Sequence, residues 1–229
     1  EYLEDFPGKQ DVLRYALTAN APETKDNDFT WKDFQARNNN ELAAVFGNFI
    51  NRIVVLTNKY YDGVVPTPNE FTEVDEQTLA ELKAYPSVIS SSIERYRFRE
   101  AQVELMNVAR LGNKYLADEE PWKMVKTDAE RVKTQMYVAL QVAAALRVLC
   151  EPFLPFTACK LAGMLKTSDD LNWKTITETS DLLPAGHTIG EGEILFAQIE
   201  DAEIQKQIDK LEATKTANAM EEKTIDPQK

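Results

Sequence analysis

Residues 30–63 read TWKDFQARNNNELAAVFGNFINRIVVLTNKYYDG. Apolar side chains recur along this stretch at intervals of three and four residues, at Phe34, Leu42, Val45, Phe46, Phe49, Ile53 and Leu56. Such spacing is typical of a helix that buries one face. The Thr30 hydroxyl can cap the backbone N–H near Asp33, and Asp62-Gly63 can end the helix. The stretch therefore predicts one helix of about 32 residues, which is about 48 Å long at 1.5 Å per residue.

The same periodicity predicts further helices downstream. The first is expected from about Glu76, with a break or kink at Pro86, and the second from Arg97 to Leu116, with a basic exterior. Three more helices are expected: one from Thr127 to Cys150, a short one that ends at Leu165, and one at Ala202–Thr214. Residues 167–197 look irregular, apart from a short strand expected at Glu193–Phe196. Helices of this length with short connections bury one stripe each by packing together. The predicted fold is therefore all-α, an antiparallel helix bundle.

The predicted bundle occupies the middle of the chain. Residues 1–29 are expected to be a connector, with a short amphipathic helix around Lys9–Leu17 and a polar loop after it. Residues 30–200 would form the bundle. Residues 201–229 combine the last helix with a tail from Glu221 onwards, whose charged composition predicts disorder.

Composition excludes several classes of protein. The longest unbroken apolar run, Val142–Leu146, is far below the roughly 20 residues needed to span a bilayer. The first residues, Glu1–Asp5, lack an initiator Met and form no signal peptide, so the chain is expected to be a piece of a longer protein. Cys150 and Cys159 lie on apolar helix faces without CxxC spacing, as small buried residues in a reducing compartment would. A cytoplasmic location is therefore predicted.

Motifs for catalysis and for metal binding are absent from the sequence. His187 is the only histidine, so one chain cannot assemble a Ser-His-Asp triad or a histidine-rich metal site. No GxGxxG or GxxxxGK[ST] loop occurs that would cradle a phosphate. We therefore predict no catalytic residue, no metal site and no cofactor site within these residues.

A group of side chains suited to reading an unpaired RNA base is present instead. Asn48 and Arg52 are four residues apart and so share one face of the predicted helix. Arg52 has donors for the O2 and N3 acceptors of a cytosine, and the Asn48 amide can accept from its N4 amine. Trp122, which follows Pro121 much later in the chain, could stack on the base. Taken alone, however, such polar residues are more often solvated, and such a tryptophan is more often a half-buried anchor.

Five blocks resemble, in order and in spacing, the C-terminal half of the bacterial methionyl-tRNA synthetases, a class I aminoacyl-tRNA synthetase family. Asp11–Leu17 is similar to the segment after the family's KMSKS loop, and Asp33–Leu42 to the start of its first bundle helix. Asn113-Lys114-Tyr115 and Pro121-Trp122 resemble its tryptophan corner, and Glu151–Pro155 resembles its late Pro-x-x-Pro break. The KMSKS loop itself and the paired cysteines of the family's metal-binding knuckle do not occur in the sequence.

The resemblance implies an all-α anticodon-binding domain of the class I type. In that family, the positions that match Asn48, Arg52 and Trp122 contact the CAU anticodon of initiator and elongator methionine tRNAs. Pro121 and Lys59 are further candidates for RNA contacts. The resemblance also implies that the parent enzyme, a methionine-tRNA ligase, uses ATP in a catalytic domain outside this chain, where zinc can also bind. The fragment alone should then be inactive. Its expected partners are methionine tRNA and its own catalytic domain, with no DNA and no membrane.

The net charge of −12 at pH 7 favours a different class of function. Such a charge repels a polyanion, so an acidic helical scaffold that binds protein partners is the alternative. Acidic residues, however, concentrate in residues 70–81 and 169–222, while a set of lysines and arginines lies in the middle of the chain. Because charges are screened within about 8 Å at physiological salt, the local balance matters more than the total.

Overall fold

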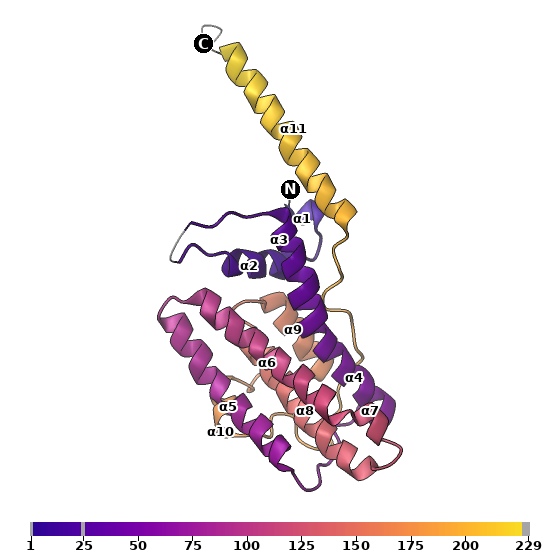
Figure 1. Cartoon of the computed structure of the whole chain (residues 1–229). Helices are drawn as coiled ribbons and strands as arrows, with labels where there is room; N and C mark the ends of the chain where they lie inside the picture. The colour runs from indigo at the N-terminus through magenta and orange to yellow at the C-terminus, as the bar shows by residue number, and fades with distance from the viewer. Residues whose placement is uncertain (1, 24–25, 226–229) are drawn as a thin grey trace.

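The computed structural model describes residues 2–23 and 26–225 and is built from helices (Figure 1). Their bounds are α1 (Tyr2–Asp5), α2 (Gln10–Ala19), α3 (Trp31–Ala36), η1 (Arg37–Gly47), α4 (Asn48–Tyr61), α5 (Glu73–Glu94), α6 (Phe98–Glu119), α7 (Pro121–Met124), α8 (Ala129–Leu149), α9 (Pro155–Leu165), α10 (Trp173–Glu178) and α11 (Asp201–Ile225). Within these described ranges no strand forms, and β pairing is limited to an isolated bridge between Val64 and Thr188. The predicted all-α class is confirmed.

Helix α8 forms the centre of the bundle. Of its 21 residues, 16 are buried, including the run Val142–Leu146. A helix that is apolar on all sides must be surrounded by other helices, and α8 packs against α4, α5, α6 and α9. The helices α5 and α6 also pack on each other, joined by a short turn that makes them antiparallel. The core therefore runs through α8, and the helices around it carry the outer surface.

The stretch of residues 30–63 forms a continuous helical rod whose hydrogen-bonding pattern changes in the middle. Thr30 caps α3 as predicted, because its hydroxyl accepts a hydrogen bond from Asp33 N at 3.1 Å. Residues 37–47 form the π-helix η1, whose turns are wider than the 3.6-residue spacing that was predicted. The rod ends at Asp62, which adopts a left-handed backbone conformation with φ of 51°.

Helix α5 begins earlier and runs further than the sequence predicts. It starts at Glu73 rather than at about Glu76, because Thr72 and Asp75 form a capping box at its N-terminus. Pro86 lies inside the helix and is buried, and the helix continues beyond it for two more turns. Of the predicted break or kink at Pro86, the break is therefore wrong. The proline ring removes one backbone hydrogen bond, and the tertiary packing of the buried face outweighs that loss.

The C-terminal part also differs from the prediction. No strand forms at residues 193–196, and α10 lies within the stretch that was predicted to be irregular. The last helix, α11, extends well beyond the predicted end at Thr214 and projects away from the body of the bundle in Figure 1. Helix α11 continues through residues 221–225, where the sequence predicts a disordered tail, and residues 226–229 lie outside the described residues. The proposed division of the chain after residues 29 and 200 stays a prediction.

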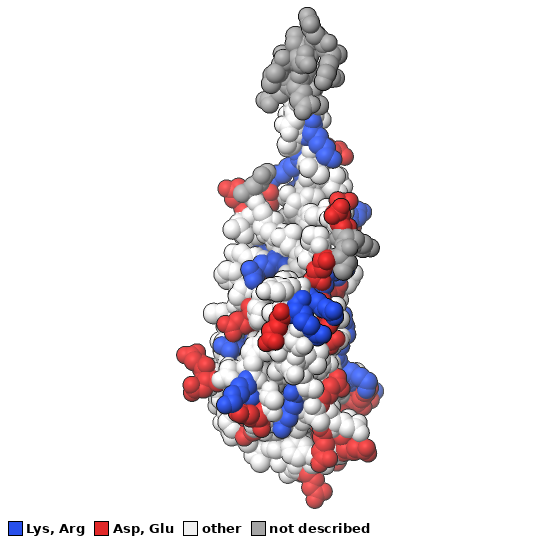
Figure 2. Space-filling model, turned by 90° about the vertical axis from the view of Figure 1, so that its left-hand side faces the viewer, with Lys and Arg blue, Asp and Glu red and all other residues white. Residues whose placement is uncertain are grey.

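The surface mixes charges of both signs. Figure 2 shows lysine and arginine side chains interspersed with acidic ones at mid-height on one face, and acidic side chains gathered toward its lower end. Cys150 is buried as expected, whereas Cys159 is exposed. None of the helices in the described part of the chain combines the length and the apolar composition that a bilayer crossing requires.

Candidate nucleic-acid interface

Arg52 of α4 and Trp122 of α7 are in direct contact. The Arg52 Cζ atom lies 4.7 Å from the centroid of the Trp122 ring, which is the geometry of a cation–π pair. Both side chains are half-buried, and Trp122 also packs against the core. Two of the three residues predicted for base recognition therefore meet in space. The guanidinium occupies a face of the ring that the prediction assigned to a base.

Asn48 lies one helical turn before Arg52 and is exposed. Its Nδ2 donates to Asn113 Oδ1 of α6 at 3.4 Å. Asn113 is held in turn, because its Nδ2 donates to Val45 O at 2.9 Å and to Ala109 O at 3.1 Å. No described residue donates to the amide oxygen of Asn48, so this oxygen can accept a hydrogen bond from a ligand. Asn113, which the sequence analysis did not place in the site, therefore orients Asn48.

Of the two supporting candidates, Pro121 directly precedes Trp122, and Lys59 lies further along α4. Pro121 is buried as the first residue of α7, where it shapes the turn, and its RNA contact stays a prediction. Lys59 is exposed two turns after Arg52, about 10 Å further along α4 at 1.5 Å per residue. Its Nζ lies 5.4 Å from the centroid of the Tyr60 ring. Its role as an RNA contact stays a prediction.

A tight turn between α6 and α7 sets the position of Trp122. Glu120 joins the two helices in a left-handed conformation with φ of 43°. Pro121 then takes the first position of α7, where its missing N–H is not needed. Across the turn, Lys123 Nζ pairs with Glu120 Oε1 at 2.6 Å. The place where α6 ends therefore decides where the indole lies.

The helices α4 and α6 approach each other closely at Gly112. A Cβ atom on Gly112 would lie 2.4 Å from ring atoms of Phe49, and both residues are buried. Because Phe49 directly follows Asn48, this close approach holds the site residues of α4 against α6.

We expect Gly112→Ala to lower the free energy of unfolding by about 1–3 kcal/mol, because the added methyl group forces Phe49 to move. Urea denaturation followed by circular dichroism measures the change. Gly163→Ala is the matched control, since Gly163 also lies in a helix but nothing lies within 4 Å of its Cβ position. That substitution should be neutral or stabilising by up to about 1 kcal/mol. Equal stability of the two variants would contradict the tight packing of α4 on α6.

Among the described residues, no group of three or more His, Cys, Asp or Glu side chains comes together as a metal site would require. His187 instead has a structural contact, because its Nε2 lies 2.7 Å from Leu165 O.

Comparison with known families places this geometry in context. A family model described as the anticodon binding domain of methionyl tRNA ligase matches residues 65–216, which is more than half of the chain. The chain belongs to this family. A second model, of class I tRNA synthetases (M), matches residues 1–54, the part that contains Asn48 and Arg52.

Relatives match the chain over its full length or nearly so. The methionine–tRNA ligase of Flavobacterium psychrophilum is 82% identical over the whole chain, which covers 33% of that protein. The corresponding proteins of Flavobacterium johnsoniae and Porphyromonas gingivalis are 71% and 57% identical, over 100% and 95% of the chain, which covers 36% and 32% of their lengths. The chain thus spans about a third of these curated relatives. The free methionyl-tRNA synthetase of Mycobacterium tuberculosis shares the fold, with a TM-score of 0.77 and 24% identity over 83% of this chain and 39% of that chain.

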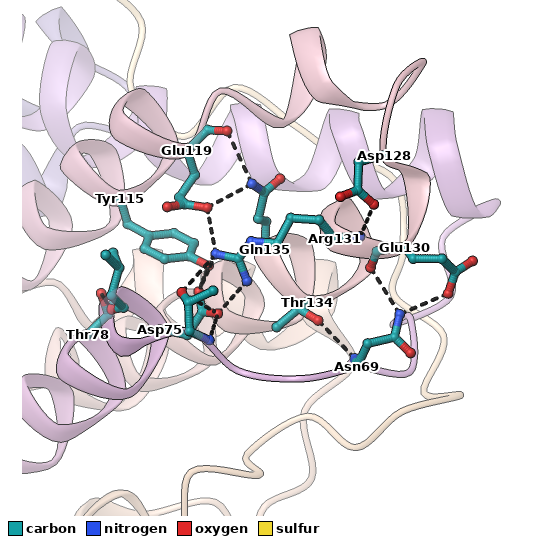
Figure 3. A network of polar contacts seen from close by, with 12 residues as sticks. Asn69, Asp75, Thr78, Tyr115, Glu119, Asp128, Glu130, Arg131, Thr134 and Gln135 are labelled. Atoms are coloured by element: carbon teal, nitrogen blue, oxygen red, sulfur yellow. Dashed lines mark hydrogen bonds and ion pairs between the residues drawn. The ribbon is translucent and has the colours of Figure 1, made fainter.

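Beside its tryptophan turn, the anticodon-binding domain contains a buried polar network that the sequence analysis missed (Figure 3). Arg131 of α8 forms an ion pair with Asp75 of α5 through Nη1, and its Nη2 donates to the second Asp75 oxygen at 2.9 Å. The same Nη2 lies 2.6 Å from Glu119 Oε2, which also accepts from Gln135 Nε2 at 2.8 Å. Tyr115 OH donates to Asp75 Oδ1 at 2.5 Å. The network ties α5, α6 and α8 together at the residue where α6 ends.

Hydrogen bonds within this network favour the charged forms of Asp75 and Arg131. Burial by itself would raise the pKa of Asp75, but the hydrogen bonds from Arg131 and Tyr115 outweigh burial and hold that pKa below its usual value. The hydrogen bond to Asp75 raises the pKa of Arg131. The spacing Thr72-x-x-Asp75 is a local capping signal that could have been found in the sequence. No local signal connects Asp75 with Arg131, which is 56 residues away.

Proposed function

We propose that this anticodon-binding domain reads the CAU anticodon of methionine tRNAs through Arg52, Trp122 and Asn48. The observation that carries the proposal is the contact between Arg52 and Trp122, with the exposed Asn48 amide one turn away. Arg52 can donate to O2 and N3 of the cytosine, while the Asn48 oxygen accepts from its N4 amine. Trp122 supplies a stacking surface, which every base can use.

Binding of the cytosine exchanges one contact of the ring for another. In the free protein the Arg52 guanidinium covers a face of Trp122, and the indole also packs against the core. The incoming base takes the place of the guanidinium, which turns to the edge of the base. A cation–π contact worth about 0.5–2 kcal/mol is thereby replaced by stacking worth about 1–3 kcal/mol. In the free protein Arg52 thus covers the Trp122 ring, and it moves away when a base binds that accepts hydrogen bonds from its guanidinium.

Local charge supports this function despite the net charge of −12. Lys59 and Lys126 are exposed on α4 and on the turn after α7, while the charge of Lys123 is balanced by Glu120. Screening within about 8 Å makes these residues count for more than distant carboxylates. The alternative, an acidic scaffold for protein partners, rests on the net charge alone.

The parent enzyme would activate methionine with ATP and transfer it to the tRNA in a catalytic domain separate from these residues. ATP, and zinc where it is used, would bind in that domain. The domain described here would bind the anticodon loop of both initiator and elongator methionine tRNAs, so that the matching tRNA reaches the catalytic part. Filter-binding titrations with both tRNAs and with a non-methionine tRNA test this directly. Equal affinity for all three would refute it.

Arg52→Ala is expected to cost about 1–3 kcal/mol of tRNA binding and to relax the preference for cytosine at the first anticodon position. The measurement compares tRNAs with CAU and UAU anticodons. Lys59→Ala is the matched control, because it removes one positive charge from the same helix without removing an edge contact. Lys59→Ala should weaken the binding of both tRNAs equally. If Arg52→Ala also weakens the binding of both tRNAs equally, Arg52 contacts the tRNA backbone, and the proposed edge reading is wrong.

A further inference from the structure

Gln135 of α8 contacts both ends of the turn that carries Trp122. Its Nε2 donates to Glu119 O at 3.2 Å and to Glu119 Oε2 at 2.8 Å (Figure 3), and it lies 3.5 Å from Met124 Sδ. Glu119 is the last residue of α6, and Met124 is the last residue of α7. One amide group therefore contacts both flanks of residues 120–123, the segment that presents the indole.

Two residues of α8 hold the end of α6. The last carbonyl groups of a helix have no partner within the helix, and the Gln135 amide supplies one for Glu119 O, next to the left-handed Glu120 that ends α6. Arg131, one turn before Gln135, has its Nη2 2.6 Å from the Glu119 carboxylate. The side chain and the backbone of Glu119 are thus both fixed from α8, the buried centre of the bundle.

The amide oxygen of Gln135 indicates a role other than stability. Gln135 is fully buried, and its Oε1 accepts no hydrogen bond from the described residues. A buried acceptor without a partner costs free energy that an apolar side chain would not. The opposite orientation of the amide would place this oxygen against the Glu119 carboxylate, so the amide keeps Nε2 toward Glu119. In some proteins, buried polar groups of this kind select one arrangement of the chain at the expense of stability.

We propose that Gln135 and Glu119 are positioning residues for anticodon recognition, which hold the turn between α6 and α7 so that the Trp122 ring is in place when a base arrives. Gln135 is too deeply buried to touch the base and acts through Trp122. A ring that is fixed before binding loses less conformational entropy when the base stacks on it. The inference rests on the proposed function, because it takes Trp122 as the stacking surface.

Gln135→Met tests this role, because methionine has a similar length and lacks the amide. We expect the affinity for a methionine tRNA to fall roughly three- to fivefold, a part of what a stacked base contributes. The melting temperature should stay near the wild-type value, because the removal of the unpaired oxygen offsets the lost hydrogen bonds. Filter binding and a thermal melt on the same preparation measure both quantities. Wild-type affinity in this variant would overturn the inference.

Gln141→Met is the matched control. Gln141 is also buried in α8, but its amide is paired on both sides, because Nε2 donates to Leu183 O and Oε1 accepts from Leu182 N and Leu183 N. The substitution should therefore lower the melting temperature and leave the affinity of the folded protein for tRNA unchanged. If the affinity falls in Gln141→Met as it does in Gln135→Met, the loss is a general effect of loosened packing, and the inference is wrong.

A double-mutant cycle shows whether Gln135 acts through Trp122. In the Trp122→Ala background, Gln135→Met should have no further effect on affinity, since no ring is left to position. Additive losses would show that the two residues act independently and would contradict the inference. Wild-type affinity in Trp122→Ala alone would instead refute the proposed function, on which the inference depends.

Glu119→Gln separates positioning from charge. Loss of a carboxylate by itself favours binding to a polyanion, whereas a loosened turn weakens binding. We expect Glu119→Gln to weaken tRNA binding roughly threefold, within the contribution of the stacked base. Asp118→Asn removes the neighbouring carboxylate, whose side chain is 51% exposed, and should not weaken binding. Tighter binding in Glu119→Gln than in the wild-type protein would show that Glu119 acts only through its charge and would contradict its positioning role.

Discussion

Asp75→Ala is expected to lower the free energy of unfolding by about 3 kcal/mol, because it removes the buried partner of the Arg131 guanidinium and leaves that side chain with the Glu119 carboxylate alone. The Asp75 side chain is fully buried and that of Arg131 is only 15% exposed, so solvent compensates little for the lost carboxylate. Urea denaturation at neutral pH measures the loss. Glu76→Ala is the matched control, since Glu76 also lies in the first turn of α5 but is exposed. It should cost about 0.5 kcal/mol or less.

The same ion pair should make stability depend on pH in the acid range. The pKa of Asp75 is lowered in the folded protein, so its contribution is complete above the unfolded-state pKa of about 4 and is lost as the pH falls through the folded-state value. The gap in stability between wild type and Asp75→Ala should therefore narrow when the pH is lowered below about 4. A gap that stays constant with pH would show that Asp75 does not act through its charge.

Trp122→Ala is expected to weaken the binding of a CAU anticodon by about 1–3 kcal/mol, or roughly 5- to 150-fold, because the base loses its stacking surface. The loss should fall toward the lower end, since in the variant the base no longer has to displace the Arg52 guanidinium from the ring. Trp122 is only half-buried, so the fold should lose less than the about 3–5 kcal/mol that truncation of a fully buried tryptophan costs. Filter binding and a thermal melt on the same preparation separate the two effects.

Two further variants distinguish a stacking surface from a structural anchor. Trp122→Phe keeps an aromatic ring and should retain part of the tRNA affinity with a melting temperature near that of wild type. Trp173→Ala removes another half-buried tryptophan that packs against the core, in α10, and should reduce stability without changing tRNA affinity. If Trp122→Ala behaves like Trp173→Ala, with a lower melting temperature and unchanged anticodon preference, Trp122 is an anchor and the assignment is wrong.

The amino-acid sequence alone determined the all-α class and most helix positions. The apolar spacing in residues 30–63 predicted the rod formed by α3, η1 and α4, and the Thr30 cap on Asp33 is present as expected. Helix α6, predicted to end at about Leu116, ends three residues later at Glu119, since Glu120 takes the left-handed conformation that ends this helix. These features depend on residues within a turn or two of one another, and the order of residues in the chain fixes such neighbours directly.

Only the tertiary structure decided the remaining features. Helix α5 continues through Pro86, although a proline is expected to interrupt a helix. The packing of the buried face outweighs one lost hydrogen bond. The residue types of Arg52 and Trp122 were readable in advance, but the covering of the indole by the guanidinium was not. Asp75 and Arg131 become a buried pair only when α5 and α8 are brought together from 56 residues apart. Each of these outcomes depends on which surfaces meet in the folded core, and no local pattern of side chains specifies that.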